Sequence, residues 1–366
     1  MLDDVRIQIN LTMNDEFLSY RRAAKYVKAC LDEAGRDAPI IGIICGSGLS
    51  GLSKALTDPL AIQYGEIPGF PAHCSVAGHA GELVVGNLAG SIPTLCLRGR
   101  FHSYEGHDMK TVALPVRMMR CLGVKFVIVT NAAGGLDPSY KVGDVVSIMD
   151  HFALPMLAGK NPLVGPNDDE LGPRFPPSSN TYDQANQDLV IKAANNLGFR
   201  DFIRKDGLYC FVSGPMYESR CECRFLANSI GGSAVGMSTV PEIIAAHASG
   251  MKVLCLSLIT NKVIITGDEG PAASHEEVLE AVEKRAVQVQ ALVQEIVKIL
   301  NESGALDKLP NLPAVDLDVK SKKSIGFTFC PYHMAKGIID APLHCLLMGG
   351  ALLGIGALVG SRALKA

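Results

Sequence analysis

The apolar run Pro39-Ile-Ile-Gly-Ile-Ile-Cys45 breaks directly into Gly46-Ser-Gly-Leu-Ser-Gly51. A short apolar run bounded by glycine-rich sequence is typical of a buried strand that feeds a turn. Glycines let backbone N–H groups approach an anion closely, and a helix that starts after the turn adds a favourable partial charge. We therefore interpret residues 46–51 as a candidate phosphate-binding loop between a strand and a helix.

Two other interpretations of this loop remain open. The glycine spacing also matches G-x-G-x-x-G, the loop of dinucleotide-binding folds, which requires an acidic residue about 20 positions further on, at the end of a second strand. Glu66 lies at roughly that distance, but Gly65-Glu-Ile-Pro-Gly69 has the composition of a loop. The dinucleotide interpretation would make the chain a nicotinamide oxidoreductase that works without phosphate. Alternatively, the glycines serve only a tight structural turn.

The same transition from an apolar run to a polar or glycine-rich turn recurs along the chain. It follows the runs 92–97, 125–129, 208–212, 233–235 and 252–258. Helical patterns lie between these runs or after them, at residues 14–31, 109–122, 241–249 and 275–300. This alternation predicts an α/β fold with a mixed, largely parallel central sheet flanked by helices. Polar residues cluster at the carboxyl ends of the apolar runs, which is the edge of an α/β sheet where ligands bind.

Composition and charge exclude several other classes of protein. Hydrophobic residues make up 48% of the 366 residues and charged residues 19%, which allows a large core and argues against wholesale disorder. The formal net charge of −3 gives no general attraction to nucleic acid, so affinity for phosphate requires a local site. Scattered cysteines without zinc-finger spacing suit a reducing cytoplasm. The N-terminal residues have no apolar core, so we expect no signal peptide.

A second polar cluster, Arg98-Gly-Arg-Phe-His-Ser-Tyr-Glu-Gly-His107, follows the run 92–97. The planar guanidinium of arginine suits phosphate, and Glu105 could fix the orientation of the His102 imidazole. A metal site built from His102, Glu105 and His107 is an alternative, although the spacing matches neither H-E-x-x-H nor H-x-x-E-H. A solvated polar loop is the other alternative.

Two further patterns bear on chemistry. Gly236-Met-Ser-Thr-Val240 partly matches the G-x-S-x-G turn of acyl hydrolases but lacks the second glycine. Ser238 fits better as a hydroxyl donor to phosphate, ahead of a helix that begins at Pro241. Glu218 accepts hydrogen bonds and Asn261 both donates and accepts them, so together they could read the edge of a heterocycle.

Motifs spread over residues 15–300 carry a resemblance to a known family. In chain order they are Cys45-Gly-Ser-Gly-Leu49, Gly78-His-Ala-Gly81, Gly99-Arg-Phe-His102, Tyr104-Glu-Gly106, Thr130-Asn-Ala-Ala-Gly-Gly135, Gly165-Pro-Asn167, Gly236-Met-Ser-Thr-Val-Pro-Glu242, Ile259-Thr-Asn-Lys262 and His275-Glu-Glu277. Together they resemble the trimeric purine nucleoside phosphorylases. The resemblance implies a single phosphorylase domain at residues 1–300 that forms a homotrimer. It also implies phosphorolysis of 6-oxopurine ribo- and deoxyribonucleosides such as inosine and guanosine, as part of purine salvage. The reaction would use inorganic phosphate as a co-substrate, with no metal or other cofactor.

The resemblance also implies a role for each candidate residue. Phosphate would be held by Ser47, His79, Arg100, His102, Ser238 and the backbone N–H of Ala132. Ribose would contact Tyr104, Met237 and His275, together with Phe175 from a neighbouring subunit. The purine would lie against Tyr217 and Val235, and would be hydrogen-bonded by Glu218 at N1 and by Asn261 at N7. The catalytic residues would be Asn261, His102, Glu105 and Glu218, with Glu105 orienting His102.

Position 261 bears on which purine the site accepts. In the related methylthioadenosine phosphorylases the matching residue is an aspartate, which suits a 6-amino group. Asn261 together with Glu218 therefore indicates a 6-oxopurine. The chain departs from the family pattern at Ser50, Met216 and Tyr217, which bears on the fit of base and sugar rather than on the reaction.

Beyond residue 300 the sequence changes character. Residues 301–337 are expected to form a linker, and residues 338–361 form an apolar segment with no charged residue from Pro342 to Gly360. About 19 apolar residues barely span a bilayer, so this segment is a candidate C-terminal membrane anchor for an enzyme that faces the cytosol. The alternatives for this segment are a helix buried against the domain, a mobile tail or an error in the gene sequence. For the whole chain, a non-enzymatic binding module tethered to a membrane is a further alternative.

Overall fold

A computed structural model describes residues 6–9, 15–72, 74, 76, 78–266, 274–318 and 325–328. The chain divides into a large compact unit, residues 14–319, and a small unit made of residues 1–13 and 320–366. In the small unit, β1 (Arg6–Ile9) pairs antiparallel with β11 (Ile325–Thr328). The candidate membrane anchor at residues 338–361 lies outside the described residues. Within the described ranges, no helix has the length and apolar character needed to cross a membrane.

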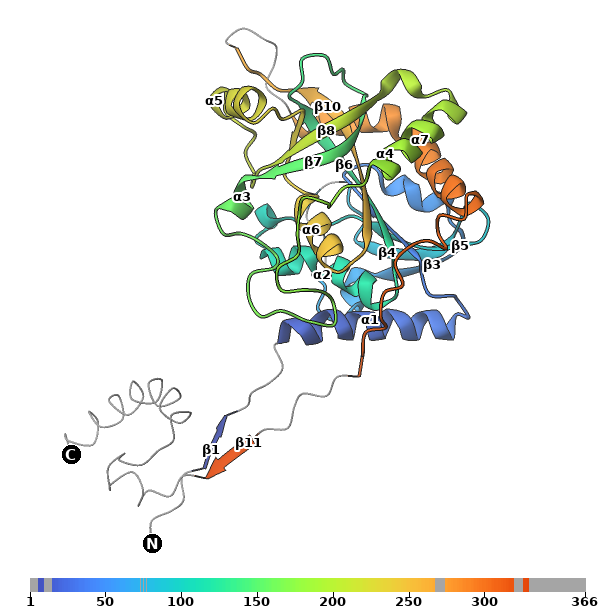
Figure 1. The fold of residues 1–366 in the computed structure, drawn as a ribbon, viewed down its shortest axis with the longest axis vertical. Coiled ribbons are helices and arrows are strands. Elements are labelled where there is room, and N and C mark those ends of the chain that lie inside the picture. The colour runs from blue at the N-terminus through green and yellow to red at the C-terminus, as the bar shows by residue number, and fades with distance from the viewer. Residues whose placement is uncertain are drawn as a thin grey trace, which may run out of the picture. The chain divides into compact units, whose positions relative to one another are not determined.

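A nine-stranded sheet forms the centre of the large unit (Figure 1). In spatial order its strands are β10 (Lys252–Lys262), β7 (Val145–Ala153), β8 (Ile203–Phe211), β9 (Ala234–Gly236), β6 (Phe126–Gly135), β2 (Ile41–Cys45), β5 (Ile92–Arg98), β4 (Glu82–Leu88) and β3 (Thr57–Gln63). Strands β2, β5, β6 and β10 run parallel to one another, whereas β3 and β4 are antiparallel to their neighbours. The expected mixed α/β sheet is confirmed.

One half of this sheet closes on itself. Strand β10 pairs with β7 at the end of the strand order and also with β6, so β6, β10, β7, β8 and β9 form a ring. Strand β9 runs antiparallel to β6 and parallel to β8. Strands β8 and β9 therefore enter the ring in the direction opposite to β6, a reversal that the expectation of a largely parallel sheet does not include.

Helices cover both faces of the sheet because successive strand residues point to opposite sides. On one face the core contains Ile44 of β2 and residues of α1 (Asp15–Glu33), α2 (Met109–Cys121) and α6 (Val240–Ala248). On the other face it contains Ile43 and residues of α4 (Gln184–Leu197) and α7 (His275–Glu302). The expected apolar stripe of α7 is buried, and Ser274 Oγ accepts a hydrogen bond from Glu277 N at 3.2 Å at the start of the helix.

Two local features differ from the expectations. The glycine-rich loop at residues 46–51 leads into a short 3₁₀ helix, Ser50–Ala55, rather than a long α-helix, because Ser50 and Gly51 are weak α-helix formers. The first part of the expected linker, residues 303–318, packs on the domain. Arg120 donates to Pro313 O at 2.8 Å and Arg21 donates to Asp316 O at 3.0 Å. These bonds join residues 303–318 to the compact unit, which extends to residue 319.

Candidate active site

A cavity lies at the carboxyl ends of six strands. Its lining residues are Gly46, Ser47, Arg100, His102, Tyr104, Asn131, Ala132, Ala133, Gly134, Tyr217, Glu218, Val235, Gly236, Met237, Ser238, Thr260, Asn261, His275 and Val278. The strands that lead into these residues run in two directions. Strands β2, β5, β6 and β10 are parallel to one another, whereas β8 and β9 run opposite to β6 on the other side of the ring. The structure therefore brings together the motifs that the sequence places far apart.

The glycine loop lies against β6. A Cβ atom at Gly46 would stand 2.7 Å from the backbone of Thr130 and Asn131, so only glycine fits at this contact. Gly46 N donates to Thr130 Oγ1 at 3.2 Å. This contact fixes Ser47 at the edge of the cavity.

His79 lies next to Ser47 and contacts the backbone of Arg100. Its Nδ1 is 3.1 Å from Arg100 N and 3.2 Å from Arg100 O, so it accepts from the first or donates to the second according to the tautomer. Nε2 lies 3.3 Å from Ser47 Oγ. Burial lowers the pKa of His79 to about 3, with His102 and Arg100 contributing, so the ring is neutral at physiological pH. His79 is therefore a neutral hydrogen-bonding partner of Ser47.

His102 is held by a carboxylate. Its Nδ1 lies 2.8 Å from Glu105 Oε1, which also accepts a bond from His102 N at 2.9 Å, and both side chains are buried. Burial lowers the pKa of His102. Because the carboxylate fixes the proton on Nδ1, the neutral ring presents an unprotonated Nε2. The His102 ring stacks on His79 at 5.3 Å and on Tyr104 at 4.6 Å, so His102 has little freedom to rotate.

The guanidinium of Arg100 is held in place by hydrogen bonds within the protein. Its NH1 donates to Thr239 Oγ1 at 2.9 Å and to Glu242 Oε2 at 3.2 Å, and its NH2 donates to Thr130 O. Arg100 and Glu242 are 2% and 3% exposed, so the charge of the buried arginine is neutralised inside the protein. The guanidinium still lines the cavity and presents a fixed cationic surface to it.

Glu218 and Asn261 line the same cavity as Ser47, Arg100 and His102, whereas His79 and Glu105 lie behind its lining residues. Burial raises the pKa of Glu218, with a further contribution from Glu222. The Thr260 hydroxyl lies 3.2 Å from Asn261 Oδ1 and 3.3 Å from Ala133 O, so two acceptors share its one proton. Among the described residues, the Asn261 amino group has no hydrogen-bond partner. Val235 is buried, whereas Tyr217 is 42% exposed.

The residues expected near the sugar are distributed unevenly. Tyr104, Met237 and His275 line the cavity. His275 Nε2 is buried, and within the described part of the chain it has no hydrogen-bond partner. Phe175 does not line the cavity of its own chain, and its side chain is 87% exposed.

The geometry argues against the alternative chemistries. Glu66 follows β3, and its Oε2 accepts a hydrogen bond from Gln63 N at 3.2 Å. Strand β3 is antiparallel to β4 and outside any βαβ unit, so the dinucleotide interpretation fails. Among the described residues, no group of three His, Cys, Asp or Glu side chains is arranged to hold a metal ion. Ser238 Oγ lies 3.1 Å from Thr239 Oγ1, and no described histidine hydrogen-bonds to it as an acyl hydrolase would require.

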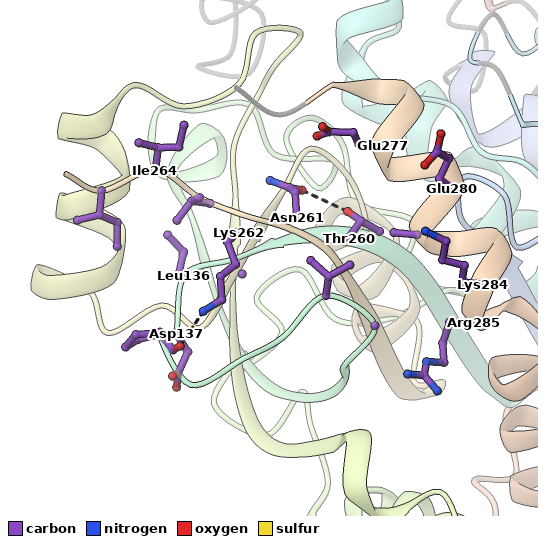
Figure 2. A pocket seen from close by; sticks show the side chains of 17 residues that line it. Leu136, Asp137, Thr260, Asn261, Lys262, Ile264, Glu277, Glu280, Lys284 and Arg285 are labelled. Carbon is purple, nitrogen blue, oxygen red and sulfur yellow. Dashed lines mark hydrogen bonds between the residues drawn. The ribbon is translucent and has the colours of Figure 1, made fainter. Parts of the chain in front are cut away.

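A larger cavity of about 810 Å³ adjoins this one (Figure 2). It is lined by β10, α7 and residues 135–143, and it shares only Thr260 and Asn261 with the smaller cavity. Its charges are of both signs and several are already engaged. Lys262 Nζ donates to Pro138 O at 2.9 Å, and the Arg285 guanidinium lies 4.0 Å from the centre of the Phe202 ring. The smaller cavity, where charged and polar groups converge, is therefore the better candidate for the chemistry.

Four residues that shape the cavity have no expected role in the sequence motifs. They are Asn131, Thr239, Glu242 and Thr260. Thr239 and Glu242 have the spacing of a capping box, with proline in the first turn of the helix, and that signal could have identified them. Asn131 and Thr260 act through long-range contacts and have no comparable local signal.

Comparisons with known proteins agree with this geometry. The sequence profile of the phosphorylase superfamily matches residues 40–298. The purine nucleoside phosphorylase of Bos taurus is 42% identical over 285 residues, which cover 78% of this chain and 96% of that protein. Purine nucleoside phosphorylase 1 of Bacillus subtilis is 44% identical, with 75% and 96% of the two chains covered. The crystal structure of Schistosoma mansoni purine nucleoside phosphorylase in complex with inosine has a TM-score of 0.71 at 40% identity, with 76% and 95% covered.

The fold is that of an enzyme of the phosphorylase superfamily, and its cavity brings Arg100 and His102 together with Glu218 and Asn261. Within that superfamily, the chain belongs to the purine nucleoside phosphorylases. Enzymes of this family are pentosyltransferases of purine salvage, which use phosphate to split a purine nucleoside into free base and ribose 1-phosphate. The resemblance drawn from the sequence motifs is confirmed.

Proposed function

We propose that this chain acts on 6-oxopurine nucleosides, with inosine and guanosine and their 2′-deoxy forms as substrates. The observation that carries the proposal is that Glu218 and Asn261 line one cavity together with Ser47, Arg100, His102 and Ser238. An ionised glutamate accepts the N1–H that only a 6-oxopurine carries. The amide of Asn261, held through its oxygen by Thr260, donates to N7. Similar proteins from Schistosoma mansoni have been crystallised with inosine and with guanosine.

Phosphate binds at the other end of the cavity in this proposal. Ser47, Ser238 and the backbone N–H of Ala132 donate hydrogen bonds, and Arg100 supplies charge. His79 supports Ser47 through its Nε2, which lies 3.3 Å from Ser47 Oγ. His102 offers an unprotonated Nε2, which accepts the remaining proton of HPO₄²⁻ in a hydrogen bond. The set therefore matches a monoprotonated dianion, with several donors and one acceptor.

Phosphorolysis then follows from how charge moves. Breaking the glycosidic bond leaves an oxocarbenium-like ribose and pushes negative charge into the purine. The bound phosphate dianion stabilises the ribose and then attacks C1′ to give ribose 1-phosphate. Asn261 stabilises the charge at N7, and donors fixed toward developing charge are the usual source of large rate enhancement. Neither a covalent intermediate nor a cofactor is needed for this sequence of steps.

Ribose lies between these two ends, against Tyr104, Met237 and His275. The unpaired Nε2 of His275 provides a hydrogen bond to a sugar hydroxyl. Tyr217 and Val235 form the walls for the base.

A homotrimer completes the sugar site in this proposal, because Phe175 would enter the cavity of a neighbouring subunit. Large exposed apolar side chains mark interaction surfaces, and Phe175 is one of them. Leu157, Met216 and Phe225 are exposed as well, and Met216 and Phe225 line an apolar groove next to Tyr217. Sedimentation equilibrium should give three times the chain mass, and Phe175→Ala should raise the KM for inosine. A monomer with full activity would contradict this arrangement.

The enzyme is proposed to work in the cytoplasm, without nucleic-acid partners, and residues 338–361 are proposed to contact a membrane. The support is the uncharged apolar stretch from Pro342 to Gly360. The full-length chain should pellet with membranes, whereas a chain ending at residue 318 should not. If both fractions stay in the supernatant, the membrane contact is wrong.

Release of free base from inosine and adenosine, each with and without phosphate, tests the central proposal. Cleavage of inosine only in the presence of phosphate is the expected result. Equal rates without phosphate would indicate a hydrolase and overturn the phosphate site. A preference for adenosine would overturn the assignment of Glu218 and Asn261.

A further inference from the structure

Thr239 occupies a strained position beside Ser238. Its backbone has φ 79° and ψ −53°, and Val240 N donates to Ser238 O at 2.9 Å across it, which makes Thr239 the centre of a tight γ-turn. A positive φ is unfavourable for a β-branched residue, and such turns are rare and strained. Residues of this kind persist where the surroundings hold them, most often at functional sites. Thr239 is fully buried, and its N–H donates to Glu242 Oε2 at 2.8 Å.

The hydroxyl of Thr239 has three polar neighbours. Arg100 NH1 lies 2.9 Å away and Asn131 Nδ2 lies 3.0 Å away. Both of these groups are donors only, so they use the two lone pairs of the hydroxyl oxygen. The third neighbour is Ser238 Oγ at 3.1 Å, and the one proton of Thr239 remains for that contact. Thr239 therefore donates to Ser238.

This direction has a consequence for Ser238. Its oxygen accepts the proton of Thr239, so its own proton is available to another acceptor. Ser238 lines the cavity, in which the phosphate dianion is the acceptor in the proposed function. A chain of hydrogen bonds then runs from Arg100 and Asn131 through Thr239 to Ser238 and on to phosphate.

We infer that Thr239 is a positioning residue for phosphate, whose strained turn and hydrogen-bonded hydroxyl direct the Ser238 proton into the cavity. The inference rests on the proposed role of Ser238 in phosphate binding. Thr239 itself does not touch the substrate. Its effect should therefore be specific to phosphate and should not extend to the nucleoside.

The test compares Thr239→Val with Thr239→Ser. Valine keeps the branched shape but lacks the hydroxyl, so Ser238 loses the donor that directs its proton into the cavity. The KM for phosphate should then rise about 10- to 100-fold, as expected when the hydrogen bond of Ser238 to the phosphate dianion is lost. The KM for inosine should change by less than about threefold. Serine keeps the hydroxyl, so Thr239→Ser should retain a KM for phosphate close to the wild-type value. An equal rise in both variants, or a rise in both KM values together, would overturn the inference.

Matched variants separate this effect from a loss of structure. Thr94 is a fully buried threonine of β5 whose hydroxyl donates to Ile92 O at 2.9 Å, away from the cavity, so Thr94→Val should leave both KM values unchanged. Tyr209 is the other buried hydroxyl near Ser238. If Tyr209→Phe raises the KM for phosphate and Thr239→Val does not, the proton of Ser238 is directed by Tyr209 and the inference is wrong. If Thr239→Val does not fold, the comparison of Thr239→Ser with Thr239→Ala decides in the same way.

Ser238→Ala distinguishes failure of this inference from failure of the proposed site. If Ser238→Ala leaves the KM for phosphate unchanged, the phosphate site is misassigned and the inference on Thr239 falls with it. If Ser238→Ala raises the KM for phosphate and Thr239→Val does not, the site stands and only the role of Thr239 is wrong. A matching rise in both supports the inference.

Discussion

The two ends of the cavity differ in how completely their polar groups are paired. At the proposed phosphate end, the guanidinium of Arg100 has partners on Thr130, Thr239 and Glu242, and His102 is held by Glu105. At the proposed base end, Asn261 Oδ1 lies 3.2 Å from the Thr260 hydroxyl, and Tyr217 is 42% exposed. The charged side chains of the first region are buried and paired within the protein, whereas the second region is partly open to solvent.

This contrast indicates a division of labour. A small anion of fixed shape can be met by rigid donors, because nothing has to rearrange when it binds. A planar base that is bound and then released needs a wall that is open on one side. We therefore expect changes at the phosphate end to affect stability as well as phosphate binding, and changes at the base end to affect turnover alone.

The largest effect is expected on stability, from the phosphate end. Glu242→Ala leaves the buried charge of Arg100 unpaired, which should lower the free energy of unfolding by about 3–5 kcal/mol. Glu218→Ala at the base end removes a carboxylate that burial already disfavours, so it should leave stability unchanged or slightly higher. Urea unfolding of both variants in phosphate-free buffer, at equal protein concentration, measures the difference. Equal losses would contradict the contrast between the two ends.

The next effect is expected on turnover, from the base end. Asn261→Ala removes the donor to N7 and should lower kcat about 10²- to 10³-fold, or about 2.7–4 kcal/mol. The KM for phosphate and the free energy of unfolding should change little. Steady-state kinetics with inosine at saturating phosphate provides the measurement. A near-normal kcat would show that the charge of the leaving purine is stabilised elsewhere.

A smaller effect is expected when the orientation of His102 is weakened. Glu105→Gln replaces a charge-assisted hydrogen bond with a neutral one, so kcat/KM for phosphate should fall roughly tenfold. Glu66→Gln is a matched control, because Glu66 caps a short 3₁₀ helix in the same way but lies outside the cavity. Kinetics of both variants should show a loss only at position 105. A similar loss at position 66 would mean that capping, and not imidazole orientation, is responsible.

The smallest effect is expected in the pH dependence of inosine use. Burial raises the pKa of Glu218, and only its ionised form accepts N1–H. As pH falls through this raised pKa the carboxylate is protonated, so kcat/KM for inosine should decline at a pH above the ordinary glutamate value of about 4.3. The decline should disappear in Glu218→Gln, whose overall kcat/KM is lower. Persistence of the same acid limb in that variant would assign it to another group.

The main elements of this fold could be predicted because their signals are local. The apolar run 41–45 and the stripe of α7 read directly as a buried strand and a helix. Strand β3, with the sequence TDPLAIQ, contains aspartate and proline, which are rare in strands, and it forms only because β4 pairs with it. Strand β7 was not predicted either, and it is held between β8 and β10.

The residues of the site could be predicted from motifs, but the strand directions that bring these motifs together could not. The sequence suggested strands ending at one edge of a parallel sheet, and this holds for β2, β5, β6 and β10. Ser238 and Glu218 instead follow β9 and β8, which run opposite to β6. These two residues reach the same cavity because the strands close into a ring. The contact of Thr239 with Asn131 joins residues distant in sequence, and no spacing rule anticipates it.

Pairing of β10 with β6 also determines at which stage of synthesis and folding the site can form. Arg100 is synthesised well before Glu242, so every shorter nascent chain carries that arginine without its buried counter-charge. The segment 136–251 must be looped out before β10 can pair with β6, and contacts of such long sequence separation form slowly. The proposed donors to phosphate come together only after this step. Cellular phosphate should therefore stabilise the finished fold by mass action and leave its folding intermediates unaffected.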